Sequence, residues 1–275
     1  MAVNHSLKSI TQICTPYLKQ LVFDINQLTI KSKNLMNPII DFLSFKKKIA
    51  VLGAFRTGTN YVRYLLESNY HCRARYDTFG WKHAGVGIFS KSSGIKYANQ
   101  PVIYISKNPA SFVASLYDYY LKVDRNIIAE KNWHDFLRGP IIIFDSKPDK
   151  STQLRFSNPV QYWNFLYWNL SNLPKDKFIS FGLRYESLIQ NPEAEISTIA
   201  KHLKLRRISE QFNLPEKKLG RMKDKQLSTH KSSVSENAFD LNAYLNAEYL
   251  QRYSMDELEF INAETDQHLL SKLGY

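Results

Sequence analysis

Cysteine is scarce in this chain, with only Cys14 and Cys72 among its 275 residues. Two cysteines are too few for a disulfide framework, and neither belongs to a C-x-x-C pair of the kind that holds zinc. We therefore expect a protein of a reducing compartment, the cytoplasm, with no bound metal.

Long apolar runs are also missing. No stretch approaches the roughly 20 apolar residues that would span a bilayer, and Lys8, Lys19 and Gln20 interrupt the apolar residues near the N-terminus. Neither a secretory leader nor a membrane anchor is expected from this pattern.

Residues 1–46 form an extension before the first core strand. We predict a helix there that packs on the domain formed by residues 47–275, because apolar residues recur at helical spacing. Positive charge at Lys31, Lys33 and the run 46–48 offers an alternative, in which this helix makes peripheral contact with a membrane surface. The apolar residues of the helix are Ile10, Cys14, Tyr17, Leu18, Leu21 and Val22.

Acidic residues are outnumbered, with 25 Asp and Glu against 37 Lys and Arg, which gives a net charge of +12. Anionic partners are therefore favoured. Nucleic acid, an acidic glycan, a membrane surface and an anionic nucleotide all match this sign, so charge alone does not choose among them. The length and a hydrophobic content of 44% suit one α/β domain with a substantial core.

The stretch KIAVLGAFRTGTNYVRYLL, residues 48–66, predicts a buried strand, a tight turn and a helix that begins at Thr59. Gly53 and Gly58 let the backbone curl around an anion, and the helix N-terminus adds partial positive charge. This turn is predicted to hold a phosphate or sulfate group. The alternative is a glycine-containing connection that binds no ligand.

This turn lacks the lysine of a nucleotide-binding P-loop. Thr59 and Asn60 follow the second glycine, where that motif has Lys and then Ser or Thr. The cation, Arg56, comes before the glycine instead. A nucleoside triphosphate with Mg²⁺ is therefore disfavoured, and a less charged group held by backbone amides and one guanidinium fits better.

The string FRTGTN after a strand resembles the 5′-phosphosulfate loop of sulfotransferases, which use 3′-phosphoadenosine 5′-phosphosulfate (PAPS) as donor. Arg56, Thr57, Gly58 and Thr59 match the family pattern, and Asn60 departs from it. The resemblance implies a three-layer, P-loop-like α/β fold with a central parallel sheet flanked by helices. It also implies PAPS binding across the carboxyl ends of the strands.

A second strand and helix, with the strand at 101–106, resembles the family's 3′-phosphate motif. Lys107, Asn108, Pro109 and Ser115 occupy its positions, with Lys107 in place of the usual Arg. Lys keeps the charge but loses the two-pronged guanidinium geometry. Lys107 at the strand end and Ser115 two turns into the helix are predicted to hold one phosphate. A solvated lysine and an ordinary helical serine are the alternative.

His83, preceded by Lys82, is the candidate catalytic base in the loop after a predicted second strand, 72–76. A histidine titrates near neutral pH and can take the proton of an attacking hydroxyl. In the family a His or Glu does this, although its spacing from the phosphosulfate loop varies. We expect Lys82 to assist. The alternative for His83 is a hydrogen-bonded loop residue without catalytic function.

The resemblance extends to the adenine and 3′-phosphate contacts. Tyr185, after a predicted strand at 178–183, matches a tyrosine that contacts adenine, or else it is a buried structural residue. The family's Arg-Lys-Gly string is absent between 206 and 240, a segment predicted to be flexible and to close over a ligand. Lys231 or Arg221 could replace it, although either could also be solvated.

The remaining segments are predicted as follows. Residues 159–170 form an aromatic helix in which Trp163 and Trp168 either line an acceptor site or, as we favour, belong to the core. Residues 145–158 form a mobile loop that shapes the acceptor cleft or is merely solvated. Ser254 and Glu257 form a capping box that opens one final helix reaching Leu273.

These observations predict a sulfotransferase that moves a sulfuryl group from PAPS to a hydroxyl or amine of a glycan, lipid or small alcohol, with carbohydrate slightly ahead. Its partners are then PAPS and the product nucleotide, 3′-phosphoadenosine 5′-phosphate (PAP), rather than nucleic acid. Two alternatives remain: a kinase or nucleotide hydrolase with a degenerate P-loop, and a non-catalytic protein that binds anions through its positive face.

Overall fold

We analysed a computed structural model of the chain. It describes residues 46–76, 79, 81–87, 99, 101–123, 132–144, 153–215 and 246–275. The predicted N-terminal helix lies outside these residues, as do Arg221 and Lys231. The described residues other than Lys46 belong to one compact unit, Lys47–Tyr275.

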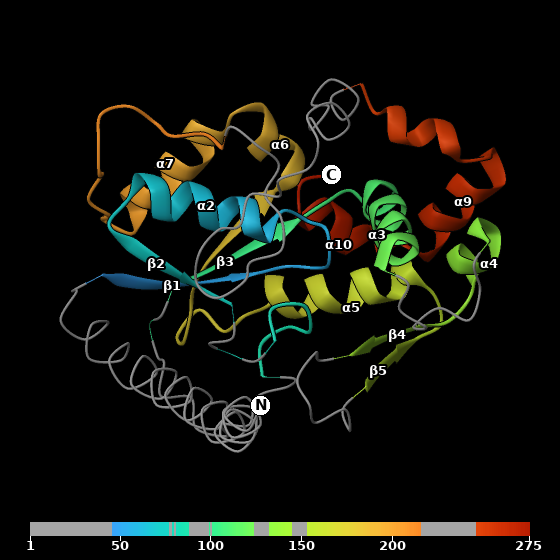
Figure 1. The fold of residues 1–275 in the computed structure, drawn as a ribbon. Coiled ribbons are helices and arrows are strands. Elements are labelled where there is room, and N and C mark those ends of the chain that lie inside the picture. The colour runs from blue at the N-terminus through green and yellow to red at the C-terminus, as the bar shows by residue number, and fades with distance from the viewer. Residues whose placement is uncertain are drawn as a thin grey trace, which may run out of the picture. The chain divides into compact units, whose positions relative to one another are not determined.

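A four-stranded parallel sheet forms the centre of this unit (Figure 1). Its strands lie in the order β2 (Cys72–Arg75), β1 (Lys47–Leu52), β3 (Pro101–Ser106) and β6 (Ile179–Arg184). Val51 of β1 is in register with Ile103 of β3, which is in register with Phe181 of β6. Because β1 and β3 are parallel neighbours, the loops that follow them leave the same edge of the sheet.

Helices cover both faces of the sheet, which explains why residues 49–52 of β1 and 101–105 of β3 are largely apolar and buried. Ile49 and Val51 point to the layer of α2 (Thr59–Asn69), α6 (Tyr185–Gln190) and α7 (Pro192–His202). Ala50 and Leu52 point to the layer of α3 (Pro109–Val123) and α5 (Pro159–Ser171). The predicted α/β class and central parallel sheet are confirmed.

A short antiparallel ribbon corrects the prediction of a loop over residues 145–158 at its described end, residues 153–158, while residues 145–152 lie outside the described part of the chain. Strand β4 (Ile141–Phe144) follows α4 (Trp133–Arg138) and pairs with β5 (Gln153–Phe156). In β5 the alternate residues Leu154 and Phe156 pack against the core while Gln153 and Arg155 are exposed. This two-residue alternation is typical of a strand, although it lies within a polar stretch.

The C-terminal region contains two helices where the sequence predicted one. The 3₁₀ helix η1 (Glu248–Arg252) precedes α9 (Met255–Glu264), which opens with the predicted Ser254–Glu257 capping box. The chain then turns at Thr265, and Asp266 caps α10 (Gln267–Lys272) by accepting from the Leu269 amide at 2.9 Å. A second N-cap residue therefore begins a separate helix directly after α9 ends at Thr265.

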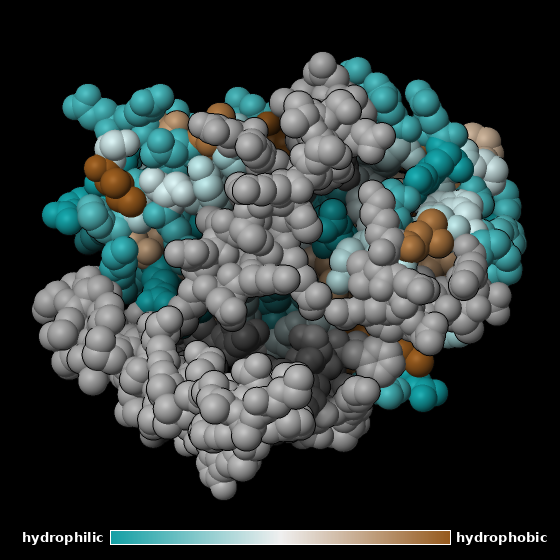
Figure 2. Space-filling view, in the orientation of Figure 1, coloured by the Kyte–Doolittle hydropathy of each residue, from teal (hydrophilic) through white to brown (hydrophobic). Residues whose placement is uncertain are grey.

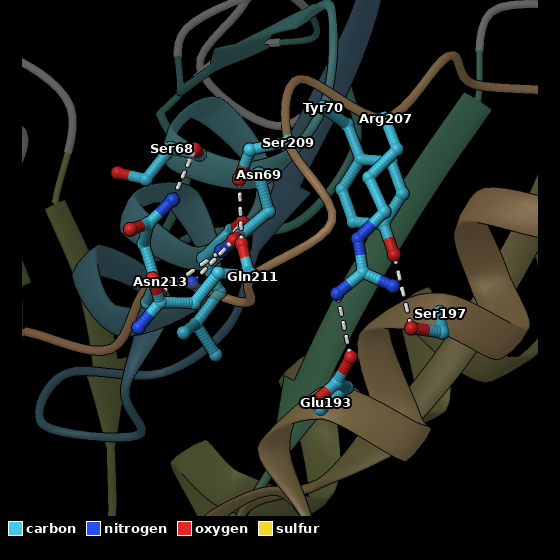
Figure 3. Close-up of polar contacts among 10 residues, drawn as sticks. Ser68, Asn69, Tyr70, Glu193, Ser197, Arg207, Ser209, Gln211 and Asn213 are labelled. Carbon is cyan, nitrogen blue, oxygen red and sulfur yellow. Dashed lines mark hydrogen bonds and ion pairs between the residues drawn. The ribbon is translucent and has the colours of Figure 1, made fainter.

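The described residues 206–214 are held by hydrogen bonds, in contrast to the flexible segment predicted there (Figure 3). Asn69, buried at the end of α2, donates to the Asn213 carbonyl at 3.0 Å and accepts from the Asn213 amide at 2.6 Å. Arg207 pairs with Glu193 of α7 at 2.6 Å, and its backbone bridges to Tyr70. This segment is fastened to both α2 and α7.

The predicted aromatic helix is α5, and its two tryptophans differ in burial. Trp163 is fully buried and donates its indole N–H to the Lys107 carbonyl at 2.8 Å, whereas Trp168 is 61% exposed. The core assignment is thus right for Trp163 and wrong for Trp168. On the described part of the face in Figure 2, apolar side chains form separate spots within a hydrophilic surface. None of the helices among the described residues has the length and hydropathy needed to cross a membrane.

Candidate anion-binding and catalytic site

The loop from Gly53 to Gly58 joins β1 to α2 and forms the centre of the candidate site. The Gly53 amide donates to the Lys82 carbonyl at 3.1 Å, and the buried Thr57 hydroxyl donates to the Ala54 carbonyl at 2.8 Å. Arg56 adopts a left-handed conformation with φ of 61°, which turns the loop back toward the helix. The predicted strand, turn and helix are confirmed, with the helix beginning at Thr59.

Gly58 is the N-cap of α2, at φ of 90°, a backbone conformation that favours glycine. Its N-cap makes no side-chain hydrogen bond to this helix end, and the start of a helix is a place where backbone amides can bind an anion. A Cβ on Gly58 would lie 2.8 Å from the Tyr185 ring. The second glycine is therefore required both by the turn and by the tyrosine packed against it.

Helix α5 contacts the loop between β1 and α2 through Tyr167. The Tyr167 hydroxyl accepts from the Ala54 amide at 3.3 Å and donates to the Ile105 carbonyl of β3 at 2.8 Å. Burial raises the pKa of Tyr167 above its usual value, so the phenol stays protonated and can donate. One buried side chain thus ties the β1 loop to the neighbouring strand.

Lys82 brings a cation to the first turn of α2. Its ammonium donates to Thr59 Oγ1 at 3.2 Å and to Asn60 Oδ1 at 3.3 Å. Thr59 stands where a P-loop motif has its lysine, so the cation missing from the loop arrives from a different segment. Three predicted site residues, Thr59, Asn60 and Lys82, lie together.

His83 is buried beside the same loop, and its Nδ1 lies 2.7 Å from the Gly53 carbonyl oxygen. Because a carbonyl can only accept, Nδ1 must carry a hydrogen, and the neutral ring then has its lone pair on Nε2. Burial, with a smaller contribution from the Lys82 charge, lowers the pKa of His83 well below its ordinary value. The imidazole is therefore neutral at pH 7 and able to accept a proton.

Aromatic rings surround His83 and fix its orientation. Phe55 stacks on the imidazole with ring centres 4.2 Å apart, and Trp81 meets it edge-on at 5.2 Å. The Tyr162 hydroxyl donates to the His83 carbonyl at 2.7 Å. The alternative for His83, a hydrogen-bonded loop residue, agrees with these contacts as well, so its catalytic role stays a prediction.

Arg56 lies on the outer side of the loop. Its side chain is exposed, and the guanidinium lies over the Tyr119 ring of α3 at 5.6 Å from the ring centre. Tyr119 in turn stacks near Phe55 at 5.9 Å. The guanidinium is thus on the aromatic side of the loop, the side of His83.

Lys107 and Ser115, predicted to hold one phosphate, contact each other. The Lys107 ammonium donates to Ser115 Oγ at 2.7 Å and lies 4.7 Å from the centre of the Tyr185 ring. Lys107 is only 1% exposed, so the alternative of a solvated lysine is wrong. Together these contacts hold the ammonium at the end of β3, beside the ring of Tyr185.

Asn108 and the start of α3 are braced by Glu186 and Tyr275. Glu186 Oε1 accepts from the Asn108 amide, and its Oε2 accepts from the Tyr275 hydroxyl, both at 2.9 Å. The Tyr275 hydroxyl also lies 3.2 Å from Ser106 Oγ at the end of β3. This network holds the backbone on either side of Lys107.

Tyr185 links the two cationic loops. It follows β6 as the first residue of α6, it is buried, and its ring lies between Gly58 and the Lys107 ammonium. The strand ends of β1 and β3 therefore meet across one aromatic side chain. Its predicted contact with adenine stays a prediction.

No protein-family model matches the sequence, and no curated protein matches it. Function must therefore be argued from the site.

Several residues that shape the candidate site were not assigned to it from the sequence, namely Tyr76, Tyr162, Tyr167 and Glu186. Their partners lie up to 113 residues away along the chain, as for Tyr167 and Ala54. Nothing in local periodicity predicts such pairs. The sequence offered one indirect signal of such contacts, its 17 tyrosines. A buried tyrosine hydroxyl usually needs a hydrogen-bond partner.

Among the described residues, no group of three or more His, Cys, Asp or Glu side chains is placed to hold a metal ion.

Proposed function

We propose that this protein is a sulfotransferase of the three-layer, P-loop-like fold, which moves a sulfuryl group from PAPS to an acceptor hydroxyl or amine. The observation that carries the proposal is that the turn ending at Gly58 and the buried Lys107 ammonium meet at the ring of Tyr185, while Lys82 adds a second cation at the first turn of α2. A nucleotide with anionic groups at both its 5′ and 3′ positions suits such a pair.

The 5′-phosphosulfate would bind at the first turn of α2. The backbone amides there, the hydroxyl of Thr59 and the Lys82 ammonium offer hydrogen-bond donors to anionic oxygens. Arg56 would approach the sulfuryl oxygens from the aromatic side of the loop. Thr57 maintains the turn through its hydroxyl, which donates to the Ala54 carbonyl, and Gly58 maintains it through its backbone conformation, so both would support the bound group through the shape of the loop.

The 3′-phosphate would bind at Lys107 and Ser115. Their mutual hydrogen bond fixes the ammonium in a buried position, and a phosphate oxygen would accept from both groups. Burial strengthens this attraction because water screens it less. Lys231 or Arg221 would add a further cation, and the Tyr185 ring would contact the adenine.

The chemical step is an in-line displacement at sulfur. The acceptor oxygen forms a bond to sulfur while the bond between sulfur and the bridging 5′-phosphate oxygen breaks, leaving PAP. Nε2 of His83 takes the acceptor proton, and the positive groups at the α2 N-terminus stabilise the negative charge that gathers on the leaving phosphate. We take a carbohydrate hydroxyl as the first acceptor class to test, before lipid and small alcohols.

A thermal-shift comparison of PAP with ADP and ATP tests the nucleotide. PAP at about 100 times its Kd is expected to raise Tm by roughly 5 °C or more, and ADP by less, because ADP lacks the 3′-phosphate. Lys107→Met should remove the preference for PAP over ADP, whereas Lys201→Met, on the exposed face of α7, should keep it. An equal response to PAP and ADP in the unmodified protein would overturn the proposal.

A kinase or nucleotide hydrolase is the second candidate, and the position of Lys82 favours it, because the ammonium lies where a P-loop lysine would act. Turnover of ATP that requires Mg²⁺ and stops in EDTA would support it. Transfer of label from ³⁵S-PAPS to a carbohydrate panel would exclude it. PAP binding without any transfer would leave the non-catalytic anion-binding protein.

A further inference from the structure

The Lys82 ammonium lies close to backbone groups that carry partial positive charge. Its contacts to Thr59 and Asn60 place it at the N-terminus of α2, where the helix dipole carries about half a positive charge. A lysine side chain also loses rotamer entropy when it is fixed. Other residues must therefore hold this cation in place.

Tyr76 provides one direct contact. It follows the last residue of β2, and the Lys82 ammonium lies 3.9 Å from the centre of its ring. The electron-rich face of an aromatic ring attracts a cation at this distance. The Arg63 guanidinium also lies over this ring, 5.0 Å from its centre, so the same side chain receives two positive groups at the edge of the sheet.

Tyr76 provides a second contact through Asn60. Its hydroxyl donates to Asn60 Oδ1 at 2.9 Å, and the same oxygen accepts from the Lys82 ammonium at 3.3 Å. A hydroxyl that donates to Oδ1 fixes the amide with its oxygen, and not its NH₂ group, toward the cation. Burial raises the pKa of Tyr76, so this hydroxyl stays a donor. Asn60 departs from the sulfotransferase pattern, and its contacts with Tyr76 and Lys82 give a structural reason for an asparagine at this position.

We propose that Tyr76 and Asn60 are positioning residues that hold the Lys82 ammonium at the first turn of α2, where it meets the 5′-phosphate end of the nucleotide. The inference rests on the proposed function for the identity of the ligand, but the array of Tyr76, Asn60 and Lys82 exists in the protein alone. Because the cation is fixed in advance, little reorganisation accompanies binding.

Affinity for two probes tests the inference. Tyr76→Phe removes the hydroxyl, and Tyr76→Leu removes the ring as well. Each is expected to weaken PAP binding in calorimetry, by about threefold and about tenfold respectively. Binding of 3′-AMP, which has no 5′-phosphate, should be unchanged in both variants. In a Lys82→Met background the Tyr76 substitutions should have no further effect on PAP affinity.

Tyr70→Phe is the matched control, because its buried hydroxyl lies 2.9 Å from Ser197 Oγ, away from the site. This variant should bind both probes as the unmodified protein does. Equal losses for PAP and 3′-AMP after Tyr76→Leu, or losses that persist in Lys82→Met, would indicate a merely structural residue and overturn the inference.

A ligand-free measurement keeps the inference separate from the proposed function. Reductive methylation followed by mass spectrometry reports the reactivity of each lysine. Tyr76→Leu should raise the labelling rate of Lys82 about threefold or more, since its contacts to the ring and to the oriented amide are lost, while exposed Lys201 serves as the internal reference. Failure of PAP to bind would overturn the sulfotransferase proposal alone. An unchanged labelling rate of Lys82 in Tyr76→Leu would overturn positioning by Tyr76, whether or not PAP binds.

Discussion

His83 shows how burial and one hydrogen bond set the tautomer and protonation of a candidate catalytic base at the scale of a residue. The Gly53 carbonyl fixes the hydrogen on Nδ1, and the aromatic neighbours pack against the ring. Asparagine in its place can donate from Nδ2 to the same carbonyl but has no basic atom at the position of Nε2. His83→Asn is therefore expected to retain PAP binding and to lower sulfuryl transfer by about 100-fold or more. Calorimetry with PAP and ³⁵S transfer measure the two properties, and a variant with unimpaired transfer would remove His83 from the mechanism.

The lowered pKa of His83 also predicts how stability depends on pH. In the unfolded chain this histidine binds a proton near pH 6.5, whereas in the folded protein it stays neutral to a lower pH. The unfolded state therefore binds more protons below pH 6.5, and the free energy of unfolding falls as pH drops through that range. We expect the free energy of unfolding, measured by urea denaturation at pH 7.5 and at pH 5.5, to fall less between these two pH values in His83→Asn than in the unmodified protein. An identical fall would mean that His83 is protonated in the folded state.

At the scale of elements, the end of α2 is fastened to the segment after α7 by one buried amide. Asn69 exchanges two hydrogen bonds with Asn213 and donates a third to the Leu65 carbonyl. Asn69→Ala leaves the Asn213 backbone groups without these partners, so the free energy of unfolding should fall by about 2 kcal/mol. Urea denaturation measures this loss. Ser209→Ala, which removes an exposed hydroxyl bonded to Gln211, is the control and should change stability little.

Affinity for PAP should stay within about twofold in Asn69→Ala, because the substitution lies at the opposite end of α2 from Gly58. A variant as stable as the unmodified protein would show that the segment 206–214 is not held by this amide.

The elements themselves differ in how well sequence predicts them. The apolar runs 49–52 and 101–106 gave β1 and β3 because central parallel strands are buried on both faces. Strand β5 was missed because its four residues alternate within a polar stretch, and only pairing with β4 makes that alternation significant. The break between α9 and α10 was missed because Asp266 caps a helix whose apolar residues continue the same period. Local patterns predict an element, whereas its pairing and its ends depend on neighbours.

At the scale of the whole molecule, sequence predicted the segments of the candidate site but not how they contact one another. Residues 53–60 and 107–115 were chosen from local motifs, and the parallel pairing of β1 with β3 brings them to one edge. The contact of Lys82 with Thr59 and of Tyr185 with Gly58 spans different elements. Such contacts follow from tertiary packing, which no spacing along the chain specifies.

The net charge of +12 gives the last prediction, because two kinds of anion binding respond differently to salt. Exposed cations that attract a polyanion are screened within about 8 Å at physiological ionic strength, whereas a buried cation such as Lys107 is screened much less. Between 50 and 300 mM NaCl we expect binding of fluorescent heparin or poly(A) to fall by more than about 100-fold. Binding of PAP should fall by less than about tenfold in the same buffers, since much of its attraction comes from buried donors. If binding of heparin, poly(A) and PAP depended equally on salt, all three would bind to the positive surface and not to the buried groups at the two strand ends. That result would favour the non-catalytic anion-binding protein.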